Sequence, residues 1–402
     1  MLRTTPLVDG HNDLPWRIRE DTLHSNDLEA YSLTVRAPGM TDLPRMKQGM
    51  VGAQFWSVYE PGEPDASTYK RNGKVTGTPG YARVQLEQIE LAKRMIAKYP
   101  RDLVLATTEA DVRKAFREGR IGSLLGMEGG HAIENSLEAL RAYYDLGARY
   151  MTLTHNVTLD WADAALDSAV HHGLTPFGRE VVREMNRMGM LVDLAHVSPA
   201  VMSNALDVSE APVIFSHSAS RELVNHPRNV PDSILRRVPK NGGVVMVPFV
   251  VSFVNRAVKA YEDSLAAEEK VLKARFAGDM PAAGRPLADW KQRHPRPDAT
   301  LSDVADHIEH VRRVAGVDHV GIGSDLDGIT TTIVGLEDVS KFPMLLAELA
   351  RRGWTDQDLR KLAGENVLRV LKTAEQVSAR LKKQRPASIA TIEQLDGAKP
   401  TP

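Results

Sequence analysis

A histidine and an aspartate stand one residue apart in the segment Leu7-Val-Asp-Gly-His-Asn-Asp13, near the start of the chain. The apolar beginning of this segment predicts a β-strand. Side chains alternate between the two faces of a strand, so we expect His11 and Asp13 to project together from its end. An imidazole and a carboxylate placed in this way can bind one metal ion together. An isolated His-x-Asp pair is more often a strand that runs into a polar turn, so the prediction depends on the rest of the chain.

Other short apolar segments also run into residues that commonly bind metals. One such residue is more often a capping or loop residue, but the same ending on six segments is hard to explain by chance. The set exceeds what one tetrahedral zinc ion with an open position needs. It suits two divalent ions that share a bridging carboxylate and a bridging water, which is machinery for amide hydrolysis. The residues at these endings are His11 with Asp13, Glu128, His155, His196, His217 and Asp325.

Eight apolar segments, separated mostly by segments with helical periodicity, position these residues. This alternation favours parallel strands joined by helical crossovers, and eight repeats predict an α/β fold of the (β/α)8 TIM-barrel type. In such a barrel the carboxyl ends of all strands meet on the face that carries the active site. The helices after the first and sixth strands are less distinct, which leaves a doubly wound sheet as an alternative. The predicted strands are residues 7–13, 51–59, 121–127, 150–155, 191–196, 213–217, 243–249 and 319–325.

The barrel is predicted to occupy residues 1–372, and residues 373–402 are predicted to form a polar C-terminal extension. Residues 252–300 interrupt the pattern after the seventh strand with charged helical sequence and a proline-rich end. An insertion at this point starts from the face of the barrel that carries the site. It is expected either to cover the site as a lid or to extend into solvent.

Composition excludes several classes of function. The 51 lysines and arginines nearly balance the 52 aspartates and glutamates, so no net charge favours nucleic acid or an anionic membrane. The absence of cysteine excludes disulfides, thiolate nucleophiles and zinc–cysteine sites. Neither a phosphate-binding glycine loop nor a Gly-x-Ser-x-Gly elbow is found. Apolar runs are too short to span a bilayer, so we expect a soluble protein without a membrane anchor, cytoplasmic as written, or secreted or periplasmic if a leader has been removed.

Longer motifs surround the candidate ligands and support a more specific prediction. They are Asp9-Gly-His-Asn-Asp-Leu-Pro-Trp16, Gly126-Met-Glu-Gly-Gly-His131, Leu153-Thr-His-Asn156 with Trp161-Ala-Asp163, Asp193-Leu-Ala-His-Val-Ser198, Phe215-Ser-His-Ser218, Arg228-Asn-Val-Pro-Asp232 and Gly323-Ser-Asp-Leu-Asp-Gly328. In sequence and in order, these segments resemble the signatures of the membrane (renal-type) dipeptidases, which are binuclear zinc enzymes with an amidohydrolase-like barrel. The resemblance covers about residues 7–371.

The resemblance implies which residues bind the two zinc ions. His11 and Asp13 would hold one ion, and His196 and His217 would hold the other. Glu128 would bridge the pair.

The resemblance also implies three substrate-contacting roles. His155 would polarise the scissile carbonyl and stabilise the tetrahedral oxyanion. Arg228 would bind the free carboxylate of a dipeptide, which a guanidinium matches with two parallel hydrogen bonds. Asp325 would move a proton from the bridging water to the leaving amine and contact the free amino group of the substrate.

Some neighbouring residues are rivals for these roles or are structural. Arg221 is an alternative to Arg228, and Asp327 is an alternative to Asp325. Five aromatic or imidazole side chains near the motifs are interpreted as loop, core or pocket residues: Trp56, Tyr59, His131, His171 and His172.

The predicted function is therefore zinc-dependent hydrolysis of small dipeptides, including those of the L-Xaa-D-Xaa type, and a homodimer would be compatible with the family. Another amidohydrolase reaction, on a lactam, a lactone or a phosphotriester, is the first alternative. Those relatives typically open with His-x-His and often bridge their metals through a modified lysine, whereas this chain opens with His-x-Asp. An inactive metal-binding barrel is the second alternative, although the intact ligand set disfavours it. Animal members of the family carry a lipid anchor and disulfides, and neither is expected here.

Overall fold

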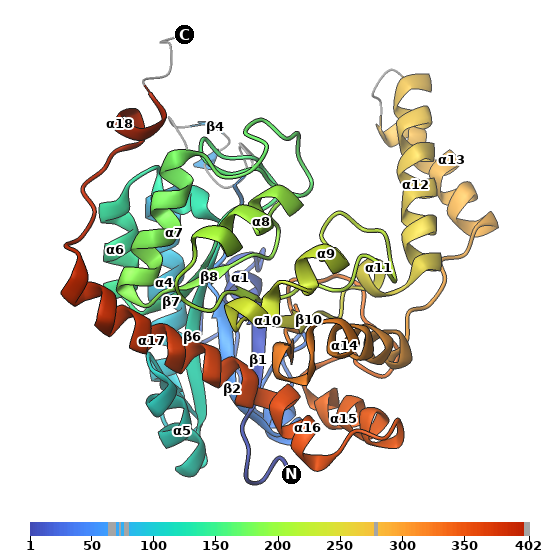
Figure 1. Cartoon of the computed structure of the whole chain (residues 1–402). Helices are drawn as coiled ribbons and strands as arrows, with labels where there is room; N and C mark the ends of the chain where they lie inside the picture. The colour runs from blue at the N-terminus through green and yellow to red at the C-terminus, as the bar shows by residue number, and fades with distance from the viewer. Residues whose placement is uncertain (63–69, 72–73, 76–79, 277–279, 398–402) are drawn as a thin grey trace.

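Eight parallel strands form a closed barrel at the centre of the molecule (Figure 1). The computed structural model describes residues 1–62, 70–71, 74–75, 80–276 and 280–397. Pairing runs from β1 through β2, β6, β7, β8, β9, β10 and β11 and back to β1. This closure confirms the predicted (β/α)8 barrel and excludes a doubly wound sheet, which has two open edges. The barrel strands are β1 (Leu7–Asn12), β2 (Val51–Ser57), β6 (Ile121–Glu128), β7 (Ala148–Thr152), β8 (Leu191–Asp193), β9 (Ile214–Phe215), β10 (Val244–Val247) and β11 (Val320–Ile322).

Several of the predicted strands are too long at their carboxyl ends. The strand predicted to reach residue 196 stops at Asp193, where the carboxylate accepts a hydrogen bond from the Ala195 backbone N–H at 3.1 Å. His196 and Asp325 both have positive φ angles, of 65° and 64°, which no strand contains. The candidate ligands on these segments therefore lie on turns that follow the strands, and their side chains can point inward across the barrel mouth.

Three further strands were not predicted. β5 (Leu103–Leu105) pairs with the first three residues of β6 outside the ring. β3 (Lys70–Arg71) and β4 (Lys74–Val75) form a short antiparallel hairpin. Segments of two or three residues are too short to show a periodic pattern.

Helices connect the strands and cover the outside of the barrel (Figure 1). Local capping fixes many of their ends, as at α8, where Ser198 accepts a hydrogen bond from the Val201 backbone N–H and Pro199 opens the helix. The helices are α1 (Leu14–Arg19), α2 (Leu43–Gln48), α4 (Tyr81–Lys98), α5 (Glu109–Arg117), α6 (Leu137–Asp145), α7 (Pro176–Met188), α8 (Pro199–Val208), α9 (Asp232–Leu235), α10 (Val238–Asn241), α11 (Val251–Val254), α12 (Arg256–Arg275), α13 (Met280–Arg293), α14 (Leu301–Ala315), α15 (Phe342–Arg351), α16 (Asp356–Arg360), α17 (Asn366–Gln384) and α18 (Ile392–Asp396).

One buried cluster packs apolar side chains of the barrel strands and of α17 around a tyrosine. Tyr150 is fully buried with its ring 5.2 Å from that of Phe55. A Cβ atom on Gly126 would lie 2.0 Å from the Tyr150 ring, so glycine at this position lets the ring lie across β6. The Tyr150 hydroxyl thereby reaches the candidate ligand His11. Other members of this cluster are Val8, Leu124, Leu191, Val244, Met246, Val367 and Leu371.

The insertion after β10 is a helical hairpin of α12 and α13 that extends away from the barrel (Figure 1). The rings of Tyr261 and Trp290 join the two helices at 5.7 Å. Residues 277–279 of the predicted insertion lie outside the described residues. The connection begins with α11, whose Phe253 lines the cavity described below.

The C-terminal segment packs against the barrel helices. The boundary predicted at residue 373 lies inside α17, which runs on to Gln384. Asp396 at the end of α18 accepts a hydrogen bond from the Phe177 backbone N–H at 2.9 Å, which holds the tail to α7. None of the helices in the described part of the chain has the length and apolar character needed to cross a membrane.

Candidate metal centre

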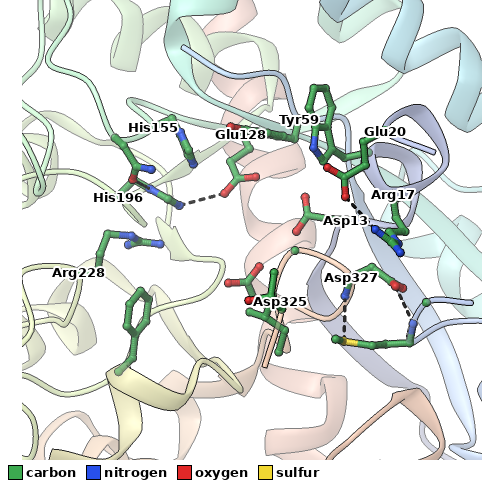
Figure 2. A pocket seen from close by; sticks show the side chains of 18 of the residues that line it. Asp13, Arg17, Glu20, Tyr59, Glu128, His155, His196, Arg228, Asp325 and Asp327 are labelled. Carbon is green, nitrogen blue, oxygen red and sulfur yellow. Dashed lines mark hydrogen bonds and ion pairs between the residues drawn. The ribbon is translucent and has the colours of Figure 1, made fainter. Parts of the chain in front are cut away.

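A cavity of about 710 Å³ opens at the carboxyl ends of the barrel strands and gathers most of the predicted site residues (Figure 2). Asp13, Glu128, His155, His196, Arg228 and Asp325 all line it. His11 and His217 are not among its lining residues, and 0% and 1% of their surface is exposed. The structure therefore brings together every residue that the sequence placed in the site.

The first half of the centre comes from β1. His11 Nε2 lies 3.2 Å from Asp13 Oδ2 and 3.3 Å from Glu128 Oε2. The other ring nitrogen, Nδ1, lies 2.8 Å from the Tyr150 hydroxyl, which fixes the orientation of the imidazole. His11, Asp13 and Asp325 also form a group whose potential ligand atoms lie within 4.8 Å of one another.

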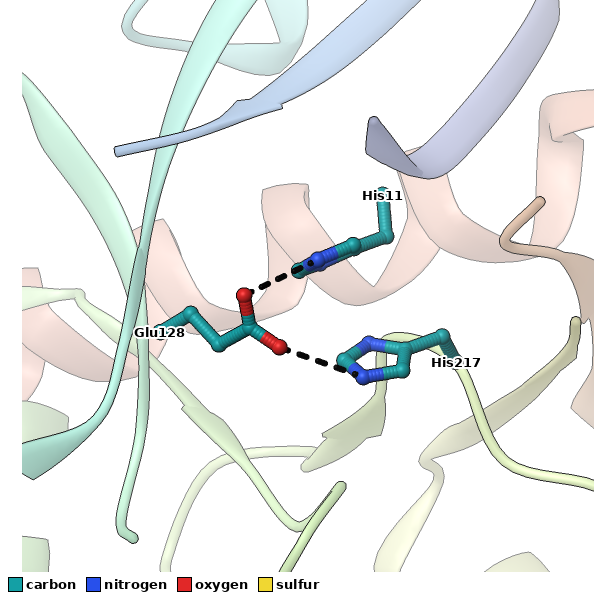
Figure 3. Close-up of side chains that lie close together, drawn as sticks. All are labelled: His11, Glu128 and His217. Atoms are coloured by element: carbon teal, nitrogen blue, oxygen red, sulfur yellow. Dashed lines mark ion pairs between the residues drawn. The ribbon is translucent and has the colours of Figure 1, made fainter. Parts of the chain in front are cut away.

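The second half comes from the turns after β8 and β9. Nε2 of His196 lies 3.0 Å from Glu128 Oε1, and Nε2 of His217 lies 3.4 Å from the same oxygen. Figure 3 shows Glu128 between His11 and His217, with one carboxylate oxygen directed at each imidazole. Glu128 is therefore the residue that joins the two halves.

The directions of the imidazole nitrogens fit a divalent metal. His196 Nδ1 lies 3.1 Å from the Asn156 Oδ1 atom, an acceptor, so Nδ1 carries the hydrogen and Nε2 carries a lone pair. His196 Nε2 and His217 Nε2 face each other at 2.9 Å. Lone pairs and carboxylate oxygens that converge in this way repel one another unless a cation binds among them. Outer nitrogens held by the protein with inner nitrogens pointing at a common centre are typical of metal-binding histidines.

The pKa values of the histidines differ between the two halves of the centre. Burial, together with the nearby Arg228 cation, lowers the pKa of His196 well below its usual value, and burial also lowers that of His217, so both imidazoles are neutral. Burial opposes the charge on Glu128 as well, but the His11 and His196 imidazoles outweigh it and hold the pKa of this carboxyl well below its usual value. The pKa of His11 is raised, because Tyr150, Glu128 and Asp13 outweigh the effect of burial. His196 and His217 are thus neutral and Glu128 is ionised, which are the protonation states that bind metals, whereas His11 must give up its proton when a metal binds.

Arg228 and Asp325 also line the cavity; in the view of Figure 2, Arg228 lies below His196 and Asp325 lies below Glu128. Arg228 is 2% exposed, and its Nη1 makes no hydrogen bond with any residue that the structure describes. Burial lowers its pKa to about 10, while Asp325 opposes this effect, so the guanidinium is charged at neutral pH. Burial raises the pKa of Asp325 well above its usual value, although the neighbouring His11 acts in the opposite direction. The left-handed backbone at Asp325 is a strained conformation of the kind found at functional sites.

His155 lies on the loop after β7, between two aromatic rings. Its ring centroid is 4.9 Å from that of Tyr59 and 4.4 Å from that of His196. Glu128, His155 and His196 form a group whose potential ligand atoms lie within 4.8 Å of one another. An imidazole at this position can donate a hydrogen bond into the cavity.

The rival residues lie in different places. Arg221 is half-buried outside the cavity and donates to the Pro227 carbonyl. Asp327 lines the cavity, but its Oδ1 accepts a hydrogen bond from the Met40 backbone N–H at 2.7 Å. Burial raises the pKa of Asp327 to about 6.

Of the other aromatic and imidazole residues, one lines the cavity and others lie away from it. Tyr59 lines the cavity, whereas Trp56 is completely buried in the core. His131 contacts the Glu60 carbonyl, and His171 contacts the Leu159 carbonyl, both away from the cavity lining.

Sequence reasoning missed several residues that shape the cavity. Trp16 and Arg17 come from α1, directly after the first ligand pair, Glu20 caps the end of this helix, and Phe253 comes from the start of the insertion. A helix that starts immediately after a ligand must present its first turn to the site, and this spacing could have identified the α1 residues. Phe253 carried no comparable signal, because its placement depends on the path of the insertion.

Comparison with known proteins identifies the family. The sequence matches the profile of the membrane dipeptidases, peptidase family M19, over residues 1–385. The chain belongs to this family. The predicted resemblance is confirmed, and the chain is a metallo-dipeptidase, a hydrolase that acts on peptide bonds.

Solved structures of similar proteins show the same fold. The probable dipeptidase PvdM from Pseudomonas aeruginosa is 24% identical, with a TM-score of 0.78 over 94% of this chain and 97% of that chain. A metallo peptidase from Rhodobacter sphaeroides, solved with a phosphinate mimic of the dipeptide L-Ala-D-Ala, is 25% identical, with a TM-score of 0.73 over 92% of this chain and 99% of that chain. An amidohydrolase from Pseudomonas aeruginosa is 22% identical, with a TM-score of 0.68 over 93% and 97% of the two chains.

Proposed function

We propose that this M19 dipeptidase uses two zinc ions to hydrolyse small dipeptides, including those with a D-residue at the carboxyl end. The observation that carries the proposal is the charge arrangement of the cavity. The buried Arg228 guanidinium lies on one side of the cavity together with the His155 and His196 imidazoles, and the carboxylates of Asp13, Glu128 and Asp325 lie across from it (Figure 2). A zwitterionic dipeptide has the complementary arrangement, with its amide bond between opposite terminal charges.

The metal-binding residues divide into two sets. His11 and Asp13 would hold one zinc ion, His196 and His217 would hold the other, and Glu128 would bridge them. When bound, the two ions supply Lewis acidity that lowers the pKa of a water molecule and polarises the scissile carbonyl. The shared Glu128 carboxylate, with one oxygen toward each half, supports this division.

Arg228 would anchor the substrate by its free carboxylate. Its Nη1 lacks a partner among the described residues, and a buried guanidinium gains most from a carboxylate that replaces its lost hydration. Because Arg228 is almost completely buried, a chain that continued beyond this carboxylate would meet protein. The arrangement therefore supports cleavage of dipeptides rather than of longer peptides.

Asp325 and His155 would carry out the proton transfer and the charge stabilisation. Asp325 would accept a proton from the attacking water as the oxygen bonds to the carbonyl carbon, and would deliver that proton to the leaving nitrogen as the C–N bond breaks. The raised pKa of Asp325 suits a group that must hold a proton between these two steps. His155 would donate a hydrogen bond to the oxyanion that develops on the carbonyl oxygen.

The Rhodobacter sphaeroides protein was solved with a phosphinate mimic of L-Ala-D-Ala, which supports a substrate of the L,D type. A panel of dipeptides with L,L, L,D and D,L configuration tests the proposed substrate class. Hydrolysis of each dipeptide is measured with protein whose metal content has been determined. We expect turnover of L,L- and L,D-dipeptides and a content of two zinc ions per chain. N-acetylated and C-amidated dipeptides serve as controls that remove one terminal charge each. Metal-loaded protein that cleaves none of the panel would disprove the proposal.

A further inference from the structure

Two pairs of neighbouring strands carry the same aspartate–serine contact beneath the candidate metal centre. Asp193 on β8 is in register with the residue of β9 that lies two positions before Ser216. Asp9 on β1 is in register with the residue of β11 that lies two positions before Ser324. All four side chains are completely buried. We name Asp193 with Ser216 the Asp193 clamp, and Asp9 with Ser324 the Asp9 clamp.

The hydrogen bonds of the two clamps are the same atom by atom. The Ser216 backbone N–H donates to Asp193 Oδ1 at 2.8 Å, and the Ser216 hydroxyl donates to Oδ2 at 2.6 Å. The Ser324 backbone N–H donates to Asp9 Oδ1 at 2.7 Å, and the Ser324 hydroxyl donates to Oδ2 at 2.7 Å. Each serine is thus held at two points, and its position relative to the neighbouring strand is fixed.

The residue that follows each clamped serine is a site residue. Ser216 precedes His217, and Ser324 precedes Asp325. The segment that carries His217 and the segment that carries Asp325 are therefore attached to the barrel by the same contact, although the two residues would have different roles in the reaction.

The Asp193 clamp determines which nitrogen of His217 carries the hydrogen. The Ser216 hydroxyl has one hydrogen, and it is directed at Asp193 Oδ2. The hydroxyl oxygen also lies 2.8 Å from His217 Nδ1, where it can only accept. His217 Nδ1 is therefore the protonated nitrogen, and Nε2 presents its lone pair toward Glu128.

The Asp9 clamp acts on backbone rather than on a ring nitrogen. The Ser324 hydroxyl oxygen accepts a hydrogen bond from the Leu326 backbone N–H at 3.3 Å. The Asp325 backbone N–H donates to the His11 carbonyl at 3.1 Å. These contacts hold the turn in which Asp325 takes its left-handed conformation, and so they set the direction of its carboxylate.

We propose that both clamps are sets of positioning residues with separate targets: the Asp193 clamp orients His217 for metal binding, and the Asp9 clamp orients Asp325 for proton transfer. This inference rests on the proposed function, because it assigns those roles to His217 and Asp325. It predicts that the same serine-to-alanine change has a different consequence in each clamp. If the two clamps were purely structural, the two serine-to-alanine variants would lose similar amounts of stability, and neither would selectively lose zinc affinity or kcat.

The Asp193 clamp is tested by metal affinity, with a matched control on the other side of the same histidine. Ser218 is also buried, and its hydroxyl has no hydrogen-bond partner among the described residues. Apo forms of the wild type, Ser216→Ala and Ser218→Ala are titrated with Zn²⁺ against a chromogenic chelator. We expect one of two zinc equivalents to bind about 10- to 100-fold more weakly in Ser216→Ala, the usual effect of removing a contact behind a ligand. Ser218→Ala should bind as the wild type does, and Ser216→Thr, which keeps the hydroxyl, should restore affinity.

Nitrogen NMR of the histidine rings gives a readout that is independent of turnover. In the apo wild type, His217 should be the Nδ1-protonated tautomer, and in folded Ser216→Ala this preference should be lost. A wild-type tautomer with hydrogen on Nε2 would overturn the assignment.

The Asp9 clamp is tested by Ser324→Ala. We expect both zinc equivalents to bind with unchanged affinity, while kcat falls about 10- to 100-fold from misplacement of Asp325, with little change in KM. The inference is overturned if Ser216→Ala binds zinc as Ser218→Ala does, or if Ser324→Ala loses a zinc equivalent. Failure of the proposed function is a distinct result, because the wild-type chain would then bind no zinc or leave every dipeptide intact.

Discussion

A Cβ atom on Gly328 would lie 2.2 Å from Oδ2 of Asp13 and 2.6 Å from Oδ1 of Asp325. Gly328 is thus packed against two carboxylates that belong to different parts of the proposed site. Asp13 Oδ2 is also the oxygen that approaches His11 Nε2. Even one methyl group at position 328 must displace a carboxylate, because an aspartate side chain is too short to move aside without turning away from the centre.

We therefore expect Gly328→Ala to lower kcat/KM about 100-fold, the cost of displacing reacting groups by about 1 Å. Because Gly328 is exposed on the cavity wall, the unfolding temperature should change little. The control is Gly284→Ala on α13, where a Cβ atom meets no atom within 4 Å. Steady-state kinetics and thermal unfolding of the two variants check the prediction, and wild-type activity in Gly328→Ala would show that the carboxylates tolerate displacement.

Replacement of Arg228 by methionine should weaken binding of the substrate carboxylate. A hydrogen bond to a charged group contributes about 1.5–3 kcal/mol, so kcat/KM for dipeptides should fall about 10- to 100-fold. A dipeptide amide, which lacks the carboxylate, should be cleaved slowly by the wild type and no more slowly by Arg228→Met. Arg221→Met is the matched control, because Arg221 lies outside the cavity. Equal losses in the two variants would argue against an anchoring role for Arg228.

The ligand positions could be predicted from the sequence because each lies at the carboxyl end of a strand of a barrel. Short apolar segments located β1 and β6, and the barrel topology then brought His11 and Glu128 together. The precise approach of these residues could not be predicted, because it depends on turns after the strands. His196 and Asp325 point inward only because their backbones take left-handed conformations that local sequence patterns do not reveal.

Residues that support the ligands were harder to identify than the ligands themselves. In the sequence, nothing distinguishes Tyr150 from an ordinary strand residue. Its contact with His11 depends on the space that Gly126 leaves in the neighbouring strand. Phe253 lies in an insertion whose path no periodic pattern describes. Such residues are determined by tertiary packing, which a single sequence does not encode in any local window.

Asp325→Asn should separate metal binding from proton transfer. The amide keeps the shape of the side chain but cannot accept and return a proton, so kcat should fall by a factor of about 10² to 10⁴. Metal content should stay at the wild-type level, because the proposed ligands are unchanged. Asp327→Asn is the comparison, since Asp327 lines the same cavity but is held by the Met40 backbone N–H. A larger loss of kcat in Asp327→Asn would transfer the proton-carrying role to that residue.

Removal of metal should abolish dipeptide hydrolysis while leaving the barrel folded. The outer nitrogens of His11, His196 and His217 keep their protein contacts without a cation, so the ligands stay close to their places. We expect the chelated protein to keep its far-ultraviolet circular dichroism and to unfold at a lower temperature, because a ligand that binds the folded state adds stability by mass action. Stepwise return of Zn²⁺ should restore turnover. Full activity in metal-free protein would contradict the proposed chemistry.

The buried side chain of Glu60 should make stability depend on pH. Glu60 is 1% exposed, and its two carboxyl oxygens have no hydrogen-bond partner among the described residues. Burial raises its pKa from 4.5 to about 9; Arg19 opposes this effect, and Glu134 and Glu87 reinforce it. In the folded protein Glu60 thus keeps a proton that the unfolded chain releases between these values. The folded state binds more protons, so the free energy of unfolding falls as pH rises from about 5 to 9.

Glu60→Gln should remove this contribution, because the amide has the same shape and does not ionise. The difference in free energy of unfolding between Glu60→Gln and the wild type should shift in favour of the variant as pH rises from 6 to 9, by at most about 1.4 kcal/mol per pH unit for a single proton. Urea unfolding at several pH values measures this difference, with Glu90→Gln on the exposed face of α4 as the control. A difference that stays constant with pH would mean that Glu60 is ionised in the folded protein, and that a cationic partner balances its charge.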